Sequence, residues 1–357
     1  MLSANNSPTK SRVKEQIARL SALTLIFSYA ELLIPRIIPF FRVGLGNSSL
    51  LMAFDLTVPS FIVLSIVKSV ASCLMAGTLL SPFFVISLAQ SVSSALGMWL
   101  LYKINMKTRI RLLGLYGISM CGSAISAVVQ ISLSSLYLGE GTLKLLGPML
   151  LFNLASGIIT AALAEYIQAE INGAGTRETS AWENKGTQVE NKGSQVETEC
   201  TGSKTKVEFW KNQIVLVIAL LSFSISIFFI KNIYVLLGSL VLSFIFQKMS
   251  GRKILLVPHI SLWIFAIISS ILVPNGMVLF SIFGFSITKG ALVIGLQKAL
   301  RLSAVSALSQ CAASLRPKEG TILSLTLSYY RAMSDRFRNT EGNILLKIKA
   351  TLKLSLV

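Results

Sequence analysis

The chain has 357 residues, of which 53% are hydrophobic and only 13% are charged, and its mean hydropathy is +0.70. Soluble domains carry about 25% charged residues, so this composition argues against a soluble enzyme and predicts an all-α integral membrane protein. The formal charge of +18 comes from lysines and arginines that lie mainly in short gaps between apolar runs. Basic loops of this kind stay on the cytoplasmic side of a membrane. They favour a multi-pass protein of the cytoplasmic membrane over a protein that binds nucleic acid.

The first half of the chain contains six apolar runs that we expect to be membrane helices. A spanning helix needs about 20 mostly apolar residues. The runs cover 17–40, 48–58, 59–80, 82–102, 112–137 and 145–168, and the second of them is short. The bases between Lys10 and Arg19 predict a cytoplasmic N-terminus, and the basic cluster from Lys103 to Arg111 then falls on the same side after four crossings. Residues 1–170 are therefore predicted to form a six-helix membrane domain.

Residues 171–206 interrupt the apolar pattern. They include a seven-residue tandem, Glu-Asn-Lys-Gly-Thr-Gln-Val at 183–189 followed by Glu-Asn-Lys-Gly-Ser-Gln-Val at 190–196. One apolar residue per repeat is too few for a coiled coil, and the segment has no apolar face to bury. We expect a disordered cytoplasmic linker.

The second half, residues 207–357, has four further apolar runs, at 212–230, 232–247, 254–273 and 278–310. Pro274, Asn275 and Gly276 predict a turn on the outer side. The segment from Arg316 to Glu341 is too polar to span, and the basic tail from Leu345 to Val357 is predicted to be a helix at the membrane surface. This half should contain four or five helices.

Motifs of several enzyme classes are absent from the sequence. It has no GxxxxGK[ST] phosphate-binding loop and no HExxH, GxSxG or CxxC arrangement. Its two aspartates, Asp55 and Asp335, lie too far apart in the sequence to form a paired site for magnesium diphosphate. The four cysteines are scattered, and the single histidine, His259, is interpreted as structural. The sequence thus predicts a protein that is not an enzyme and has neither a metal site nor a cofactor.

Polar residues inside apolar runs are candidates for substrate binding, because a polar group in the bilayer is costly unless it has a function. The candidates are Glu31, Arg42, Asn47, Lys68, Gln130 and Asn153. Together they predict a polar, net-basic pocket open to the outside, suited to an anionic or amide-rich solute.

Each candidate also has a purely structural interpretation. Glu31 could form an ion pair with Arg36, and Arg42 could belong to an ordinary external turn. Lys68 could extend its ammonium to the membrane surface. Gln130 and Asn153 could simply hold helices together.

Residues 17–168 resemble the small-molecule-binding S components of energy-coupling-factor transporters. The resemblance is to the Gx-transporter group, also called heptaprenyl diphosphate synthase component I. It rests on Ala-Leu-Thr-Leu-Ile-Phe-Ser-Tyr-Ala-Glu-Leu-Leu-Ile-Pro at 22–35 and on Arg-Val-Gly-Leu-Gly-Asn at 42–47. S components use an AxxxA first helix for docking, so the resemblance implies that Ala18 and Ala22 contact a transmembrane partner. The segment 124–130 departs from the family: of its His-Asn pair and Gln, only Gln130 remains.

Residues 207–340 are similar to the T component, the transmembrane coupler of the same transporters. The similarity rests on residues 283–302 and on Ser-Leu-Thr-Leu-Ser-Tyr-Tyr-Arg at 324–331. It implies that coupling to ABC-type ATPase subunits involves the arginines near the C-terminus: Arg316, Arg331, Arg336 and Arg338. The short Ala-Arg-Gly/Ser motifs by which T components enter the ATPases are missing here.

The resulting hypothesis is a solute-uptake component in which an S-like domain is fused to a shortened T-like domain. It would bind an external vitamin, cofactor or isoprenoid precursor and couple to separate ATPases. Two alternatives stay open: a membrane accessory component of heptaprenyl or polyprenyl diphosphate synthesis, and a scaffold subunit of another membrane complex.

Overall fold

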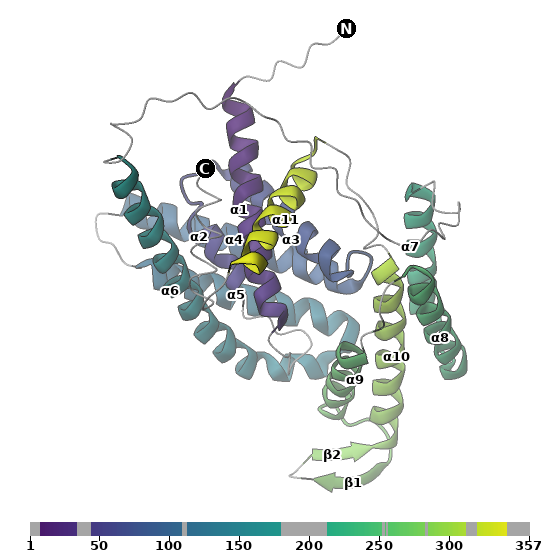
Figure 1. The fold of residues 1–357 in the computed structure, drawn as a ribbon. Helices are drawn as coiled ribbons and strands as arrows, with labels where there is room; N and C mark the ends of the chain where they lie inside the picture. The colour runs from purple at the N-terminus through teal and green to yellow at the C-terminus, as the bar shows by residue number, and fades with distance from the viewer. Residues whose placement is uncertain are drawn as a thin grey trace.

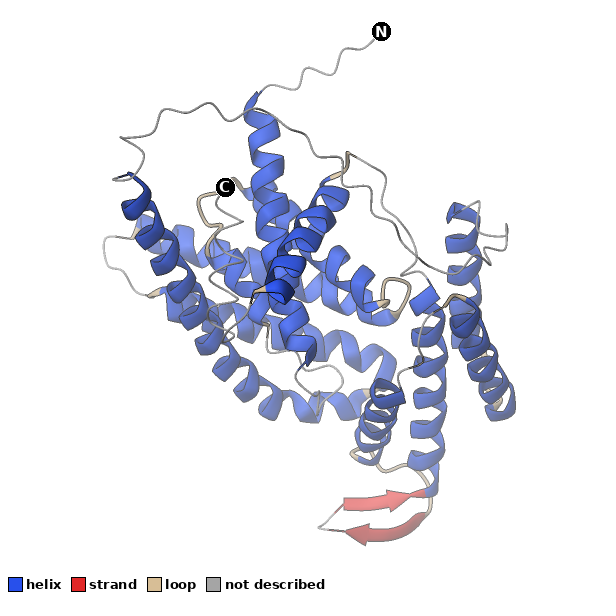
Figure 2. Ribbon diagram, in the orientation of Figure 1, coloured by secondary structure: helices blue, strands red, loops and turns tan. Residues whose placement is uncertain are grey.

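The computed structural model describes residues 8–33, 44–108, 113–179, 213–251, 254, 256–282, 285–311 and 320–340. The described part is built almost entirely of helices, with one short β-hairpin (Figure 2). The candidate positions Glu31 and Arg338 lie in helices, but their side chains are outside the described set. Arg42, Arg316 and the tail from Leu345 to Val357 lie outside the described residues altogether.

The first half forms a bundle of long helices around one short irregular segment (Figure 1). Its elements are α1 (Pro8–Leu33), η1 (Leu45–Asn47), α2 (Ser48–Leu51), α3 (Val58–Ala76), α4 (Pro82–Lys107), α5 (Leu115–Leu138), η2 (Glu140–Leu145) and α6 (Leu146–Thr179). Proline and glycine set several boundaries. A proline lies in the first two positions of α3 and α4, where its missing N–H costs nothing, and Gly77 ends α3 in the left-handed conformation.

Two predictions for the first half are corrected. The run 48–58 is not a spanning helix, because α2 has only four residues and the chain turns up to Thr57 before α3 begins. Gly44 and Pro59 flank this run, and glycine and proline both disfavour a continuous helix. Helix α6 extends to Thr179, so the first residues of the predicted linker are helical; residues 180–206 lie outside the described part.

The second half is arranged around one helix, α10 (Lys289–Cys311), which packs against three others (Figure 1). These are α7 (Gln213–Phe229), α8 (Ile233–Met249) and α9 (Leu256–Ile271). Polar side chains tie the group together: the Trp263 indole donates to Ser303 Oγ at 2.7 Å, and Gln247 Nε2 donates to Gln310 Oε1 at 2.6 Å. The last described helix, α11 (Ile322–Asn339), leaves this group and crosses α1.

The predicted helical run 278–310 is only partly helical. Its first residues form an antiparallel hairpin of β1 (Val278–Ile282) and β2 (Phe285–Thr288), in which Val278 pairs with Thr288 and Ile282 with Phe285. These residues are mostly β-branched or aromatic, the types that favour strands. The glycine turn before them and the hydrogen bond from Lys289 N to Met277 O at 3.1 Å join the hairpin to α10.

The protein is a multi-pass membrane protein. Five described helices are long and apolar enough to cross a bilayer, within Val58–Ala76, Pro82–Lys107, Leu115–Leu138, Glu140–Ala169 and Lys289–Cys311. Helices α7, α8 and α9 are shorter but also apolar. Large apolar side chains lie exposed on many helices, among them Leu136, Leu151 and Phe229. In a soluble protein, exposed apolar surface of this extent would promote aggregation. In this membrane protein it faces lipid.

Two lysines join the halves at one end of the bundle, and each binds a backbone carbonyl oxygen of the other half. Lys298, on α10, donates from Nζ to the carbonyl oxygen of Leu138 at the end of α5, at 2.5 Å. Lys144, on η2, donates from Nζ to the carbonyl oxygen of Leu272 just beyond α9, at 2.6 Å. A cation at a helix C-terminus is favourable because unpaired carbonyl groups gather there. Each half thus supplies a cation to a helix end of the other.

The backbones of the two halves also come very close at this interface. A Cβ atom at Gly141 would overlap the carbonyl oxygen of Ser269. We predict that Gly141→Ala lowers the stability of the full chain by about 1–3 kcal/mol, as for other overpacked sites, seen as a lower melting temperature in detergent. Gly147→Ala is the matched control, since no atom lies within 4 Å of an added Cβ there. Equal melting temperatures for the two variants would contradict this packing.

Candidate functional site

The irregular segment between α1 and α3 brings Asn47 into the interior of the first half. Gly44 starts η1 with a φ of 76°, a conformation that glycine adopts without strain. Gly46 lies so close to α1 that an added Cβ would be 2.9 Å from Ser28 Oγ. Ser49 Oγ holds the segment by a hydrogen bond with Thr24 Oγ1 of α1. The two glycines therefore allow the backbone to pack directly against a transmembrane helix.

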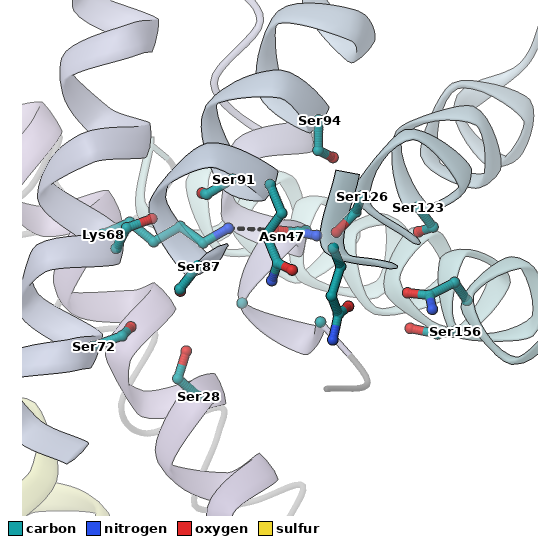
Figure 3. Close-up of a pocket in the computed structure, with 16 residues that line it drawn as sticks. Ser28, Asn47, Lys68, Ser72, Ser87, Ser91, Ser94, Ser123, Ser126 and Ser156 are labelled. Atoms are coloured by element: carbon teal, nitrogen blue, oxygen red, sulfur yellow. Dashed lines mark hydrogen bonds between the residues drawn. The ribbon is translucent and has the colours of Figure 1, made fainter. Parts of the chain in front are cut away.

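A polar cavity lies beside this segment, between helices α1, α3, α4, α5 and α6 (Figure 3). The empty space among its lining residues is about 630 Å³ when adjoining open solvent is counted, but only about 60 Å³ can hold the centre of a water molecule. The lining consists of nine serines, four side-chain amides, two glycines and one lysine. The amides are Asn47, Gln90, Gln130 and Asn153. The described lining residues are thus all polar residues or glycine, whereas most ligand pockets are lined mainly by apolar side chains.

Lys68 is the one charged residue among the described residues that line the cavity. It lies in the middle of α3 and is only 8% exposed. Its Nζ donates a hydrogen bond to Oδ1 of Asn47, which Figure 3 shows as a dashed line. A buried lysine in a membrane is costly unless it is held by polar groups or serves a ligand. Asn47 fixes the ammonium group within the cavity.

Some cavity serines are used in helix packing and others are not. Ser65 and Ser91 share a hydrogen bond of 3.1 Å between α3 and α4, and Ser94 Oγ donates to the carbonyl oxygen of Gly122 on α5 at 2.8 Å. The hydroxyls of Ser123, Ser126 and their lining neighbours Ser69, Ser72, Ser87 and Ser156 make no hydrogen bond within the described part of the chain. These hydroxyl groups are therefore able to bind a guest molecule or water.

The cavity brings together four of the six residues predicted for substrate binding: Asn47, Lys68, Gln130 and Asn153. Gln130 is 4% exposed and Asn153 6%, and Asn153 Nδ2 also donates to Met149 O within α6 at 2.8 Å. The side chain of Glu31 and all of Arg42 lie outside what the structure describes. Substrate binding by these residues stays a prediction.

Gln90 and the serines of the cavity were not predicted from the sequence. A usable signal was present, because the serines recur at helical spacing on single faces. Ser87, Ser91 and Ser94 are separated by four and three residues, and so lie on one side of α4. Ser123 and Ser126 precede Gln130 by seven and four residues on α5. A polar stripe on an apolar helix indicates a cavity or a helix contact.

The predicted docking face of α1 is covered by α11 of the same chain. Ala18 and Ala22 are fully buried, and Ala22 belongs to an apolar cluster with Met333, Tyr329 and Tyr330 of α11. Arg331 and Arg336 are exposed on α11, while Arg316 and the side chain of Arg338 lie outside the described residues. Ala22 thus lies in a close contact between α1 and α11, and α11 is part of the predicted coupling region.

A polar cluster secures one end of this contact. Arg19 Nη2 donates to Glu15 Oε1 at 2.7 Å, and the Tyr329 hydroxyl donates to the same oxygen at 3.0 Å. The Arg19 guanidinium also lies 5.7 Å from the centre of the Tyr329 ring. The hydrogen bond from Arg19, and then that from Tyr329, lower the pKa of Glu15 below its usual range. This carboxylate therefore stays ionised and links α1 to α11.

Ser94 and Ser126 provide a matched pair that separates helix packing from cavity lining. Ser94→Ala removes an interhelical hydrogen bond, which in membrane proteins contributes about 0.6 kcal/mol on average. Ser126→Ala removes a hydroxyl without a described partner and should change stability by less than about 0.5 kcal/mol. We expect the Ser94 variant to unfold at a lower denaturant concentration in mixed micelles, while the Ser126 variant matches the parent chain. A larger effect at Ser126 would show that its hydroxyl has a structural partner.

Comparison with known families divides the chain into the same two halves. Residues 20–167 match the family model described as heptaprenyl diphosphate synthase component I. Residues 212–313 match a family described as a domain of unknown function, DUF8519. No curated protein and no solved structure gives a significant match. Most of the first half of the chain is therefore similar to the heptaprenyl diphosphate synthase component I family.

Proposed function

We propose that the chain is a solute-uptake component of the cytoplasmic membrane. Its first half binds an external small molecule in the polar cavity, and its second half couples this half to separate ABC-type ATPase subunits. The observation that carries the proposal is the convergence of Lys68, Asn47, Gln130 and Asn153 from four different elements on one cavity. A scaffold subunit has no need for such a cavity.

The charge pattern supports a cytoplasmic N-terminus. The beginning of α1, the end of α4 and the beginning of α5 pack in one cluster, which includes Ile17, Tyr102 and Leu115. These helix ends therefore lie at one end of the bundle, where Lys103 Nζ is 5.4 Å from the centre of the Trp99 ring. Basic residues gather on the cytoplasmic side of membrane proteins, whereas aromatic residues gather at both interfaces. We infer that this end faces the cytoplasm.

The contact between α1 and α11 supports a coupling role for the second half. A helix of small residues allows close approach within the membrane, and α11 uses that surface directly. Arg331 and Arg336 are exposed on α11, which follows the apolar helices α7 to α10 in the sequence. Both arginines are accessible to a further subunit. The resemblance to T components assigns the ATPase contact to this region.

The family description favours a second candidate function. It fits a membrane component associated with heptaprenyl diphosphate synthesis, in which the chain would assist a partner enzyme subunit. The described residues contain no group of three or more His, Cys, Asp or Glu side chains that could hold a metal. An accessory role would place the chemistry on the partner. A chain-elongation assay with the purified chain and its co-purifying proteins tests this alternative.

Purification at native expression levels tests the leading proposal. We expect a tagged chain, extracted in mild detergent, to recover ABC-type ATPase subunits and a small molecule, both identified by mass spectrometry. Recovery of a prenyl diphosphate synthase subunit in their place would support the second candidate. If neither ATPase subunits nor a small molecule were recovered, the uptake proposal would be wrong.

Ala22→Leu tests the coupling contact. Overpacking of a close interface costs about 1–3 kcal/mol, which lowers the equilibrium constant for docking of α11 on α1 roughly five- to 150-fold. We expect accumulation of the co-purifying solute in cells to fall within that range while its affinity for the purified chain is unchanged. Ala155→Leu, at an exposed position of α6, is the matched control and should accumulate solute normally. Unchanged uptake in Ala22→Leu would remove the α1–α11 contact from the mechanism.

A further inference from the structure

We infer that Lys298 and Arg301 of α10 form a binding site for the phosphate group of an anionic phospholipid, at the seam where α5, α7 and α10 meet. The inference goes beyond the proposed function, because it concerns a lipid and not the transported solute. It comes from three observations. The two cations have carbonyl oxygens as their described partners, they lie at the level of helix ends, and exposed apolar side chains lie on the same helix ends.

The two cations lie together at this seam. Lys298 and Arg301 are three residues apart, so they lie on the same face of α10. Lys298 Nζ donates to Leu138 O at the end of α5, at 2.5 Å. Arg301 Nη2 donates to Ile230 O directly after α7, at 2.7 Å. The ends of α5 and α7 also touch through two aromatic rings whose centres are 6.0 Å apart, and the two cations are close enough for their charges to repel each other.

No carboxylate pairs with these cations in the described part of the chain. The sequence contains no aspartate or glutamate between Glu208 and Glu319, so helices α7 to α10 supply none. Across the seam, the Glu140 side chain is exposed and forms no ion pair with either cation in the described part. A helix C-terminus carries roughly half a negative charge, so two helix ends leave the pair with about one unit of positive charge. A singly charged phosphodiester would neutralise it.

Arg301 keeps most of its hydrogen-bonding capacity for a ligand. A guanidinium group has five N–H donors, and the hydrogen bond to Ile230 uses one of them. Its Nε atom is buried and has no hydrogen-bond partner among the described residues. A buried donor without an acceptor is costly, and the planar fork of arginine matches the oxygens of a phosphate. A phosphate drawn into the seam would supply the missing acceptor.

The seam lies at the level of a membrane surface. Helix α5 is long and apolar enough to cross a bilayer, so its end at Leu138 marks that level. Because α5 begins at the end that we assign to the cytoplasm, this surface is the opposite one. Basic residues normally gather on the cytoplasmic side, so membrane orientation does not explain two cations here. Phospholipid phosphates lie at this level, and basic groups between transmembrane helices bind lipid headgroups.

Apolar surface for acyl chains borders the two cations. Phe229, at the end of α7, is 79% exposed, and Leu136, near the end of α5, is 75% exposed. Tyr234, at the start of α8, is 81% exposed, and tyrosine is enriched at membrane interfaces. A phospholipid would use the charge and this apolar surface together, whereas a free phosphate ion would use the charge alone. The combination therefore favours a lipid.

Lipid-dependent thermal unfolding of the full chain in detergent tests the inference. The probes are phosphatidylglycerol as the anionic lipid, phosphatidylcholine with the same acyl chains as the lipid without net charge, and glycerol 3-phosphate as the free phosphate compound. With lipid in excess, we expect phosphatidylglycerol to raise the melting temperature by about 2 °C or more above the value in phosphatidylcholine. Glycerol 3-phosphate should give no shift. An equal shift from phosphatidylcholine would overturn the charge requirement, and an equal shift from glycerol 3-phosphate would assign the site to a free anion.

Three variants link the shift to the seam. Lys298→Gln and Arg301→Gln each remove one cation and should each lose most of the difference between the two lipids. Lys248→Gln, exposed in the last turn of α8, is the matched control and should retain it. A purely structural role of the two cations would lower the melting temperature in both lipids equally and leave their difference intact, which would refute the site.

Photochemical cross-linking of the parent chain gives an answer even where a variant does not fold. A phosphatidylglycerol with a diazirine near its headgroup should label peptides from the end of α5, the α7–α8 turn and α10 more strongly than the matching phosphatidylcholine does. Equal labelling by the two lipids, or labelling confined to other helices, would contradict the inference.

Discussion

The fold of the first half depends on satisfying polar groups where lipid surrounds the protein. Backbone N–H and C=O groups in a bilayer must be bonded within the protein, which is why spanning segments are normally continuous helices. The segment from Gly44 to Thr57 breaks this rule, because it forms only η1 and the four-residue α2 before α3 begins. Irregular backbone at membrane depth is tolerated where it is buried in protein or lines a cavity. Here it does both, since it packs against α1 and presents Asn47 to Lys68.

Close helix packing and the cavity have the same origin in small residues. Gly122 and Gly157 on α5 and α6 lie where an added Cβ would touch the neighbouring helix, and Ser119 Oγ reaches across to the carbonyl oxygen of Gly157 at 2.7 Å. Helices that approach this closely leave room only for small side chains between them. Serine is the residue that is both small and polar, so the faces that pack also become the faces that line a polar space.

The helix content and the two-part organisation could be predicted from the sequence, because long apolar runs in a bilayer have few other structures available. The burial of Lys68 and Gln130 could also be predicted, because both residues lie inside apolar runs. The short α2 and the β-hairpin could not be predicted from hydropathy, since the runs 48–58 and 278–288 are as apolar as the helices around them. There the local preference of glycine, proline and β-branched residues determined the structure. The resemblance implied that Ala18 and Ala22 contact a transmembrane partner, but not that Ala22 packs against α11 of the same chain. The Glu15–Arg19 pair follows from its i, i+4 spacing on a helix, whereas the hydrogen bond from Tyr329 to Glu15 joins distant parts of the sequence.

The two halves touch at the α1–α11 contact and at the end of α5, and each contact combines hydrogen bonds with buried apolar side chains. At the end we assign to the cytoplasm, α11 lies on the small residues of α1 and adds the Glu15–Tyr329 hydrogen bond. At the other end, Lys298 and Lys144 each reach a helix terminus across the interface. Apolar packing accompanies the hydrogen bonds at both contacts. Ala22 packs with Met333 at the α11 end, and Leu138 packs with Leu262 and Phe265 at the lysine end. A movement of one half against the other would therefore have to open a buried apolar interface as well as break hydrogen bonds.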